Sequence, residues 1–113
     1  MTERTRKTDL LRGTLDLLIL RILEIQGLHG VAIADRIRQV TKGTFDVPPG
    51  SLFPALHRLE QEGWVQGEWT TNSVGRRIKA YVLTAAGKKQ LNTEKKTWDR
   101  IVGAVSQVFQ EPS

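Results

Sequence analysis

The spacing of the apolar residues changes near residue 64, and this change limits the folds that the chain can adopt. Before that point, apolar side chains recur at helical spacing in three segments, at roughly 13–26, 31–41 and between Ser51 and Gly63. Beyond it, the stretches 64–71 and 76–84 are rich in β-branched and aromatic residues, with the composition of a hairpin turn between them. A helical pattern returns over roughly 85–110. The sequence therefore predicts three helices, a two-stranded hairpin and one long helix.

The chain has 113 residues, enough for one small domain, and 39% of them are hydrophobic. Its longest apolar run, at residues 17–20, is far shorter than a membrane span. The N-terminal segment lacks the apolar stretch of a secretory signal. We therefore expect a cytoplasmic protein without a membrane partner. Because the chain has no cysteine, disulfides and thiolate metal sites are excluded.

The region before the third helix divides into a polar start and two apolar helices. Residues 1–12 are polar and basic, and we expect a basic arm there. The first helix is apolar on most sides, as is typical of a helix with neighbours on more than one flank. In the second helix, the inner stripe consists of Ile33, Ile37 and Val40. His29 is expected to mark the turn before that helix.

The third helix follows two prolines and a glycine and has one polar side. Ser51 is placed to act as its N-cap, with Pro54 in the first turn, where the missing N–H costs nothing. Leu52, Leu56 and Leu59 share the buried side. The opposite side carries Ser51, Pro54, His57, Arg58 and Gln61. Small and polar side chains near a helix N-terminus allow close approach to DNA, and the N-terminal N–H groups favour a phosphate.

Basic residues outnumber acidic ones, with 17 Lys and Arg against 12 Asp and Glu, which gives a net charge of +5. The excess is concentrated between Trp69 and Thr93, a stretch without any acid whose basic residues are Arg76, Arg77, Lys79, Lys88 and Lys89. Such a stretch favours a polyanion, most commonly nucleic acid, although a solvated charged surface is the alternative on charge alone. The order of elements favours nucleic acid. Three helices followed by a hairpin are typical of a winged helix, whose third helix enters the major groove while the hairpin wing contacts the flanking DNA.

Four blocks of the sequence occur in order between about Leu11 and Leu91: RGTLDLLILRIL, LHG, GSLFPALHRLEQEGWV and RRIKAYVLTAAGKKQL. In their order and spacing they resemble the PadR family of bacterial transcriptional regulators. The resemblance implies a mainly α winged helix-turn-helix over residues 1–84, with a long C-terminal dimerisation helix over 85–113, in one compact unit. It also implies a repressor that binds an inverted-repeat operator in double-stranded DNA as a homodimer.

The resemblance also implies which residues contact DNA. It places Ser51 and Phe53 at the start of the recognition helix and matches the family's basic wing to Arg76, Arg77 and Lys79. The family usually has Tyr where this chain has Phe53, so a hydroxyl-to-phosphate contact is lost there, and packing is the alternative role of that ring. The predicted DNA-binding residues are Ser51, Phe53, Pro54, His57, Arg58, Gln61, Arg76, Arg77 and Lys79.

Two of these positions keep an alternative role. His57 is as consistent with a solvent-exposed helix residue as with a phosphate contact. Arg58 reaches either DNA or Glu62, one turn further along the helix. The two histidines lack a matching ligand set, so we expect no metal and no other cofactor. Trp64 and Trp69 are expected to pack the wing onto the helices.

The last helix carries an apolar stripe at near-heptad spacing that so small a chain cannot cover. A stripe of this kind marks an interaction site and suits helix-to-helix packing, so we expect a homodimer. The predicted dimerisation residues are Leu91, Trp98, Ile101, Val102, Val105, Val108 and Phe109. In some PadR-family proteins an aromatic residue on this helix lines a flat pore at the dimer centre, where planar ligands stack. Trp98 is therefore a candidate site for a small aromatic effector, and a tryptophan that fills the dimer seam is the alternative.

The sequence lacks the residue sets of an enzyme. It has no credible Ser/His/Asp set, no Gly-rich phosphate loop and no paired carboxylates in a recognisable motif. The competing function is a winged-helix adaptor that binds proteins and not DNA. Such modules usually lose the basic wing, and this chain keeps Arg76, Arg77 and Lys79, which favours DNA.

Overall fold

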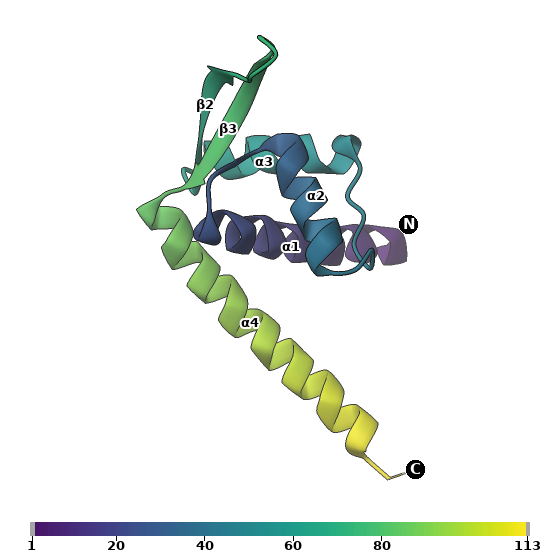
Figure 1. The fold of residues 1–113 in the computed structure, drawn as a ribbon. Coiled ribbons are helices and arrows are strands. Elements are labelled where there is room, and N and C mark those ends of the chain that lie inside the picture. The colour runs from purple at the N-terminus through teal and green to yellow at the C-terminus, as the bar shows by residue number, and fades with distance from the viewer. Residues whose placement is uncertain (1, 113) are drawn as a thin grey trace.

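The computed structural model describes residues 2–112 of the chain, with side chains from residue 13 onward. Its elements are α1 (Thr2–Ile25), β1 (Leu28–His29), α2 (Gly30–Val40), α3 (Pro49–Gln61), β2 (Val65–Thr71), β3 (Arg77–Leu83) and α4 (Ala85–Gln110). The first three helices pack together, the β2–β3 hairpin rises beside α3, and α4 leaves this body at an angle (Figure 1). The order of elements confirms the predicted winged helix with its long last helix.

The first helix is longer than the apolar pattern indicates. It begins at Thr2, whereas the pattern predicts a start near Gly13. Residues 2–12 contain neither proline nor glycine and consist mostly of good helix formers, so nothing there stops the helical backbone. The predicted start of the first helix is therefore wrong, and the backbone of the expected basic arm continues α1.

The sheet contains a strand that the sequence does not reveal. In β1, Leu28 pairs with Tyr81 and His29 with Ala80, which gives a three-stranded sheet in the order β1-β3-β2. Two residues are too few to show an alternating pattern. His29 also holds the N-cap position of α2 with extended backbone (φ −77°, ψ 163°), in agreement with the expected turn before that helix.

The third helix, α3, begins earlier than predicted. Pro48 has the extended backbone of an N-cap, and Pro49 takes the first helical position, which suits its fixed φ and missing N–H. Ser51 therefore lies inside the first turn and is not the N-cap; its N–H donates to the Pro48 carbonyl (3.0 Å). Pro54 lies inside the helix and not in its first turn, so the Gly50 carbonyl receives no bond from residue 54.

The tip of the wing has the turn chemistry that its composition predicts. Asn72 Oδ1 accepts hydrogen bonds from the N–H groups of Val74 (3.1 Å) and Arg76 (2.8 Å). Gly75 has a φ of +82°, in the left-handed region that glycine adopts without strain. These bonds fix the backbone immediately before the two wing arginines.

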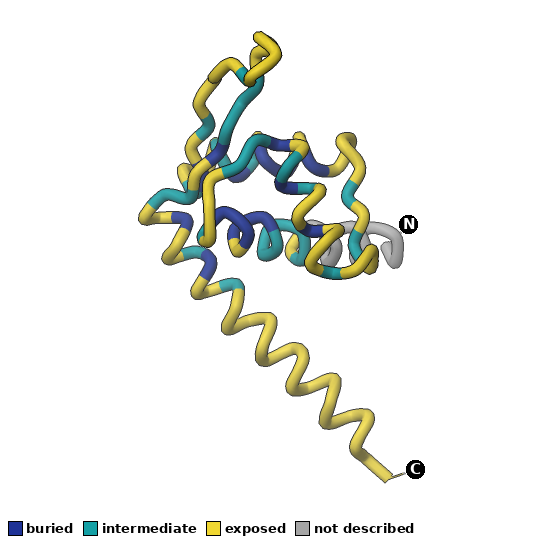
Figure 2. Tube along the Cα trace, in the orientation of Figure 1, coloured by how far each residue is buried: buried dark blue, intermediate teal, exposed yellow. Residues whose placement is uncertain are grey.

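The core lies where the first three helices meet the base of the sheet (Figure 2). Its buried residues are Ile19, Leu20, Ile22, Leu23, Ile33, Ile37, Leu52, Ala55, Leu56, Leu59, Val65, Tyr81 and Leu91. The predicted inner side of α3, with Leu52, Leu56 and Leu59, is thus confirmed. Val40 was predicted to complete the inner stripe of α2, but it is 65% exposed because the helix ends there.

The last helix starts from a predicted cap and then leaves the body. The Thr84 hydroxyl accepts the Gly87 N–H (3.0 Å) and donates to the Gly63 carbonyl (2.6 Å). Leu91 is only 4% exposed and packs into the core of its own chain, so its assignment to a dimerisation stripe was wrong. All residues from Lys95 to Pro112 are exposed (Figure 2).

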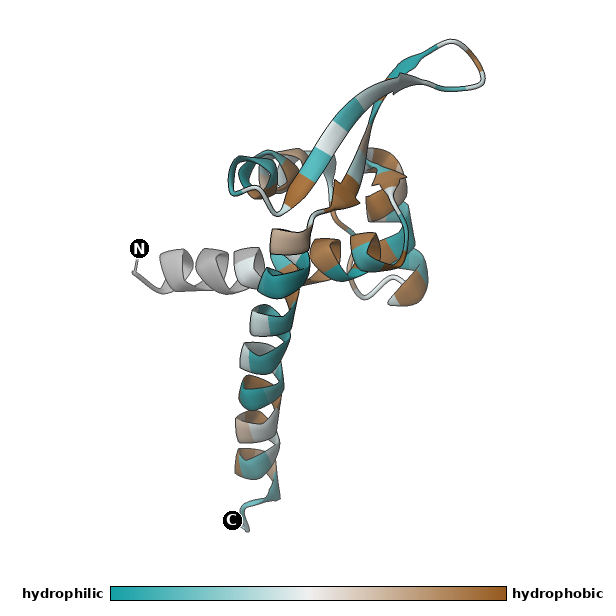
Figure 3. Ribbon diagram, turned by 90° about the vertical axis from the view of Figure 1, so that its left-hand side faces the viewer, coloured by the Kyte–Doolittle hydropathy of each residue, from teal (hydrophilic) through white to brown (hydrophobic). Residues whose placement is uncertain are grey.

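The projecting helix makes the chain elongated, with extents of 60 × 29 × 27 Å. The expectation of a single compact unit is corrected accordingly: residues up to about Leu91 share one core, and the rest of α4 stands away from it (Figure 3). None of the helices, as far as the chain is described, combines the length and apolar character needed to cross a membrane.

Candidate nucleic-acid interface

The exposed side of α3 carries most of the predicted recognition residues. Ser51, Pro54, His57 and Gln61 are all exposed, as the helical spacing predicts. Two prolines precede this side, and the core leucines of α3 hold the helix against the body from behind. The arrangement presents small and polar side chains from the first turn onward, at the positive end of the helix dipole.

The ring of Phe53 packs against the start of α2. A Cβ atom added to Gly30, at the start of α2, would lie 2.7 Å from Phe53 Cε1, so the ring rests against that backbone. The side chain is still 43% exposed. The packing role expected as an alternative for this ring is therefore present, and any side chain at residue 30 would displace the ring.

Arg58 is held by the first helix and not by its own helix. Its Nη2 lies 2.5 Å from Asp16 Oδ1 on α1, and the side chains are 32% and 13% exposed, respectively. The predicted alternative partner, Glu62, was the wrong one. Arg58 therefore ties α3 to α1, because its guanidinium is engaged in a partly buried ion pair.

Lys79 and Glu60 tie α3 to the wing. Lys79 Nζ lies 2.8 Å from Glu60 Oε1, and Glu60 Oε2 accepts the Gly67 N–H (3.2 Å). The hydrogen bond from Lys79 lowers the pKa of Glu60 below its ordinary range; partial burial opposes this shift and the Gly67 N–H supports it. The same hydrogen bond raises the pKa of Lys79. The charge of Lys79 is thus balanced by a carboxylate of α3.

Arg76 and Arg77 are the exposed cations of the wing. Within residues 13–112, neither of them pairs with a carboxylate. Their charge is not neutralised by any carboxylate of the described side chains, unlike that of Arg58 or Lys79. Of the basic residues predicted to contact DNA, these two arginines are therefore the ones presented to a partner.

Trp69 does not pack the wing onto the helices, and that prediction was wrong. It is 59% exposed, and the guanidinium carbon of Arg77 lies 4.7 Å from its ring centroid. Trp64, in contrast, is partly buried against the core as expected. The hairpin register contains a signal for this contact, because Trp69 pairs with Lys79 and lies diagonally across from Arg77.

The exposed half of α4 carries an apolar stripe (Figure 3). Its six members are between 40% and 86% exposed: Trp98, Ile101, Val102, Val105, Val108 and Phe109. All six are exposed in the described chain, although Trp98 and Ile101 border α1, and this fulfils the sequence expectation of an exposed stripe. The stripe begins at Trp98, about two helical turns beyond Leu91, after α4 has left the core.

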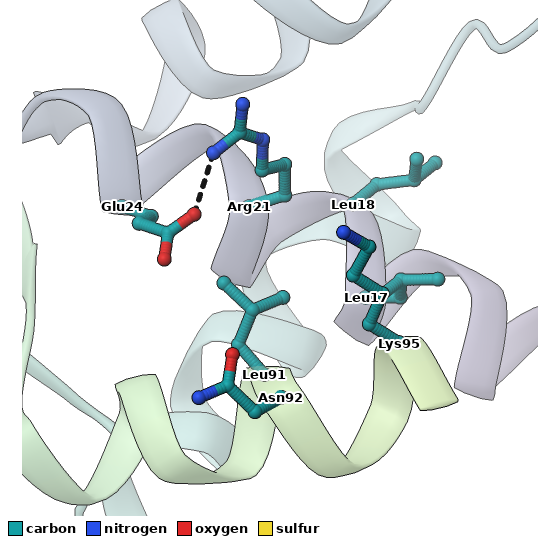
Figure 4. A pocket seen from close by; sticks show the side chains of 7 residues that line it. All are labelled: Leu17, Leu18, Arg21, Glu24, Leu91, Asn92 and Lys95. Atoms are coloured by element: carbon teal, nitrogen blue, oxygen red, sulfur yellow. Dashed lines mark hydrogen bonds and ion pairs between the residues drawn. The ribbon is translucent and has the colours of Figure 1, made fainter. Parts of the chain in front are cut away.

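Two hollows lie along the junction of α1 and α4. The larger, about 400 Å³, is shown in Figure 4, where α4 side chains face those of α1; it is lined by Leu17, Leu18, Arg21, Glu24, Leu91, Asn92 and Lys95. Arg21 and Glu24 form an ion pair at its rim (2.5 Å). The smaller, about 200 Å³, is lined by Gly13, Thr14, Leu17, Glu94, Thr97, Trp98 and Ile101. Trp98 therefore borders a small, largely apolar space already in one chain. No cluster of potential metal ligands occurs among the described residues.

Residues 19–93 match the sequence model of the transcriptional regulator PadR-like family. The chain belongs to this family. The match covers the core helices, the wing and the first part of α4, and it ends before Trp98. Membership makes this PadR-family chain a transcriptional regulator and not an enzyme, as its sequence predicted.

Named relatives agree with this assignment. The chain is similar to the transcriptional regulator Rv3488 of Mycobacterium tuberculosis, with 28% identity over 78 residues that cover 69% of each protein. A crystal structure of a PadR family transcription regulator from Clostridium difficile has 31% identity and a TM-score of 0.73, and the match covers 84% of this chain and 97% of that one. A PadR-like transcriptional regulator from Bacillus cereus has 26% identity and a TM-score of 0.77, over 92% and 99% of the two chains. Both structural matches thus place more than four fifths of this PadR-family chain beside nearly complete chains of solved PadR regulators.

Proposed function

We propose that this PadR-family regulator is a repressor that binds an inverted-repeat operator in double-stranded DNA as a homodimer. The observation that carries the proposal is the pairing of an exposed polar side on α3 with two unneutralised arginines, Arg76 and Arg77, on the adjacent wing. Polar groups on a helix suit the major groove, and free cations on a hairpin suit the flanking phosphates. Such a regulator acts in the cytoplasm, where it meets DNA.

The two elements have different roles in this proposal. Ser51, at the start of α3, meets a phosphate, while His57 and Gln61 extend along the groove toward base edges. The wing arginines grip the backbone and set the orientation without reading sequence. Arg58 and Lys79 support these contacts indirectly, because their ion pairs with Asp16 and Glu60 position the recognition helix between α1 and the wing.

The homodimer forms through α4. Most of the stability of a protein helix comes from packing of its apolar side, and the apolar stripe of α4 stays largely exposed in the described part of the chain. A second copy of the same stripe supplies it, with the near-heptad spacing that side-by-side helices require. We therefore assign DNA binding to residues up to 84 and dimerisation to residues 85–113, with Leu91 in the core of the first unit.

A small planar aromatic compound is the effector that the site near Trp98 would accept. The hollow beside Trp98 contains the apolar side chains Leu17 and Ile101, and a partner helix would add a second wall. A flat ring is matched by the indole face of Trp98. Such a ligand releases DNA only if it binds the DNA-free geometry of the dimer more tightly than the DNA-bound one.

A binding selection from random duplex DNA with the purified full chain tests the proposal. We expect enrichment of an inverted repeat whose half-sites lie about 34 Å apart, one helical turn of DNA. Enrichment of a single half-site would contradict the dimer. If no duplex is enriched and none binds with a salt-dependent affinity, the protein adaptor becomes the better account.

A further inference from the structure

The side of the wing that faces the recognition helix can be identified from Gly67. A Cβ atom added to Gly67 would lie 3.1 Å from Glu60 Oε2 on α3 and 2.4 Å from the Lys79 side chain. Side chains alternate across a strand, so Trp69, two residues further along β2, points to the same side. Trp69 is therefore on the α3-facing side of the wing, where duplex DNA held by α3 would also lie.

Aromatic rings and cations alternate along this side of the wing. Lys79 Nζ lies 5.5 Å from the ring centroid of Tyr81 and 5.8 Å from that of Trp69, and the guanidinium carbon of Arg77 lies 4.7 Å from the Trp69 centroid. At the base of the series, Glu60 balances the charge of Lys79. Toward the tip, Arg77 stacks on Trp69 and has no acidic partner among the described residues.

This arrangement prepares Arg77 for an anion. A cation held over an indole keeps its charge available, whereas one held in an ion pair must first break that pair. The stacked guanidinium also has less side-chain freedom to lose on binding. The indole itself is 59% exposed, so it has apolar area left to bury against a partner.

We propose that Trp69 is a DNA-contacting residue of the wing, with its indole against a deoxyribose of the flanking backbone and with Arg77, stacked on it, on the adjacent phosphate. This rests on the DNA binding proposed above. Charge identifies the occupant: residues 69–79 contain three cations and no acid, which complements a polyanion and not an ordinary protein surface.

Binding isotherms over several salt concentrations separate the two parts of the proposal. Arg77→Ala weakens binding and lowers the salt slope by about 1 for each wing that engages, because a phosphate contact is lost. Trp69→Ala weakens binding by about two- to fivefold for each wing and leaves the slope nearly unchanged, because the indole has no charge. Trp69→Phe recovers part of the loss. Thr70→Ala, on the opposite side of β2, is the matched control and binds like the wild type.

The Trp69→Ala/Arg77→Ala double variant tests the stacking. If Arg77 depends on Trp69, the double variant binds better than the product of the two single effects predicts. If the two substitutions instead weaken binding independently, Arg77 does not depend on Trp69 for its DNA contact, and the role proposed for the stacking is refuted. Melting followed by circular dichroism checks that each variant is folded, so that a lost fold is not taken for a lost contact.

Fluorescence reports the contact directly. In a Trp64→Phe/Trp98→Phe protein, the emission of Trp69 changes on addition of duplex DNA and saturates together with binding. If the wild type binds DNA while Trp69→Ala matches it and the Trp69 emission stays constant, the inference fails and the DNA-binding function stands. If the wild type binds no duplex, the proposed function fails as well, and the ring and its cations belong to a protein interface.

Discussion

Replacing Arg58 with alanine is expected to lower the stability of the protein. It should change the DNA sequence that the protein prefers only slightly. The guanidinium lies 2.5 Å from Asp16, across a gap of 42 residues in the chain. The Asp16 side chain is 13% exposed, and removal of Arg58 leaves that carboxylate poorly hydrated. The result is a largely buried charge that has lost its ion pair with Arg58.

The size of the effect follows from the burial of the two partners. Hydrogen bonds to charged groups contribute about 1.5–3 kcal/mol, and Asp16 makes a further contact, so we expect a loss near the lower end, about 1.5–2 kcal/mol, for Arg58→Ala. Asp16→Asn should cost less, about 1 kcal/mol, because Arg58 is 32% exposed and can turn into water. For a chain of this size, the larger loss lowers the melting temperature by about 6–8 °C at fixed protein concentration.

Thermal melts and binding to a panel of duplexes with single base changes form the assay. Gln61→Ala is the matched control on the same helix, since Gln61 is exposed and its loss should change stability by no more than about 0.5 kcal/mol while altering base preference. Suppose that Arg58→Ala melts like the wild type and relaxes the preference for one base. The ion pair would then be incidental, and Arg58 would be a base-reading residue after all.

Three further outcomes are expected. Val105→Glu places a charge in the apolar stripe, so light scattering at micromolar concentration should show monomers in place of the dimer. Gln107→Glu adds the same charge off the stripe and should leave the dimer intact, and a dimeric Val105→Glu protein would contradict the assembly. Planar aromatic compounds should quench tryptophan fluorescence through Trp98, and Trp98→Ala should abolish this; equal quenching in the variant would move the ligand elsewhere. The lowered pKa of Glu60 means that its ion pair stabilises the fold above the pKa of an unfolded glutamate, about 4.3, and that this contribution disappears as the pH falls through the folded value. Glu60→Gln should therefore lower the stability at neutral pH and lose less on acidification than the wild type, and parallel pH profiles would refute the role of the pair.

Features that depend on neighbouring residues were predictable from the sequence. The leucines of α3 are buried because helical spacing alone sets their side, and Thr84 caps α4 because the capping bond spans three residues. The turn before Arg76 was predictable for the same reason, because Asn72 and Gly75 form it within five residues. Even so, the start of α3 shifted to Pro49, because a proline fits the first helical position better than the serine fits the cap.

Features that depend on distant residues were not predictable. Nothing in the local pattern shows that Arg58 meets Asp16 or that Lys79 meets Glu60, so both were assigned to DNA. Leu91 fits the spacing of the dimer stripe, yet the angle at which α4 crosses α1 places it in the core. Trp69 resembles a packing residue by type, and only the register of the hairpin brings it beside Arg77 instead.

The most direct test of DNA binding by helix and wing is the salt dependence of affinity, measured on the selected operator and on unrelated duplex DNA. We predict that affinity falls linearly with salt on a logarithmic scale for both DNAs, and that Arg76→Ala and Arg77→Ala each lower the slope by about 2 for a symmetric dimer. Gln61→Ala should keep the slope and reduce the difference between the two DNAs. Wing variants that lose only operator binding would show that the roles of helix and wing are reversed. An affinity for duplex DNA that is absent, or independent of salt, would contradict the account altogether.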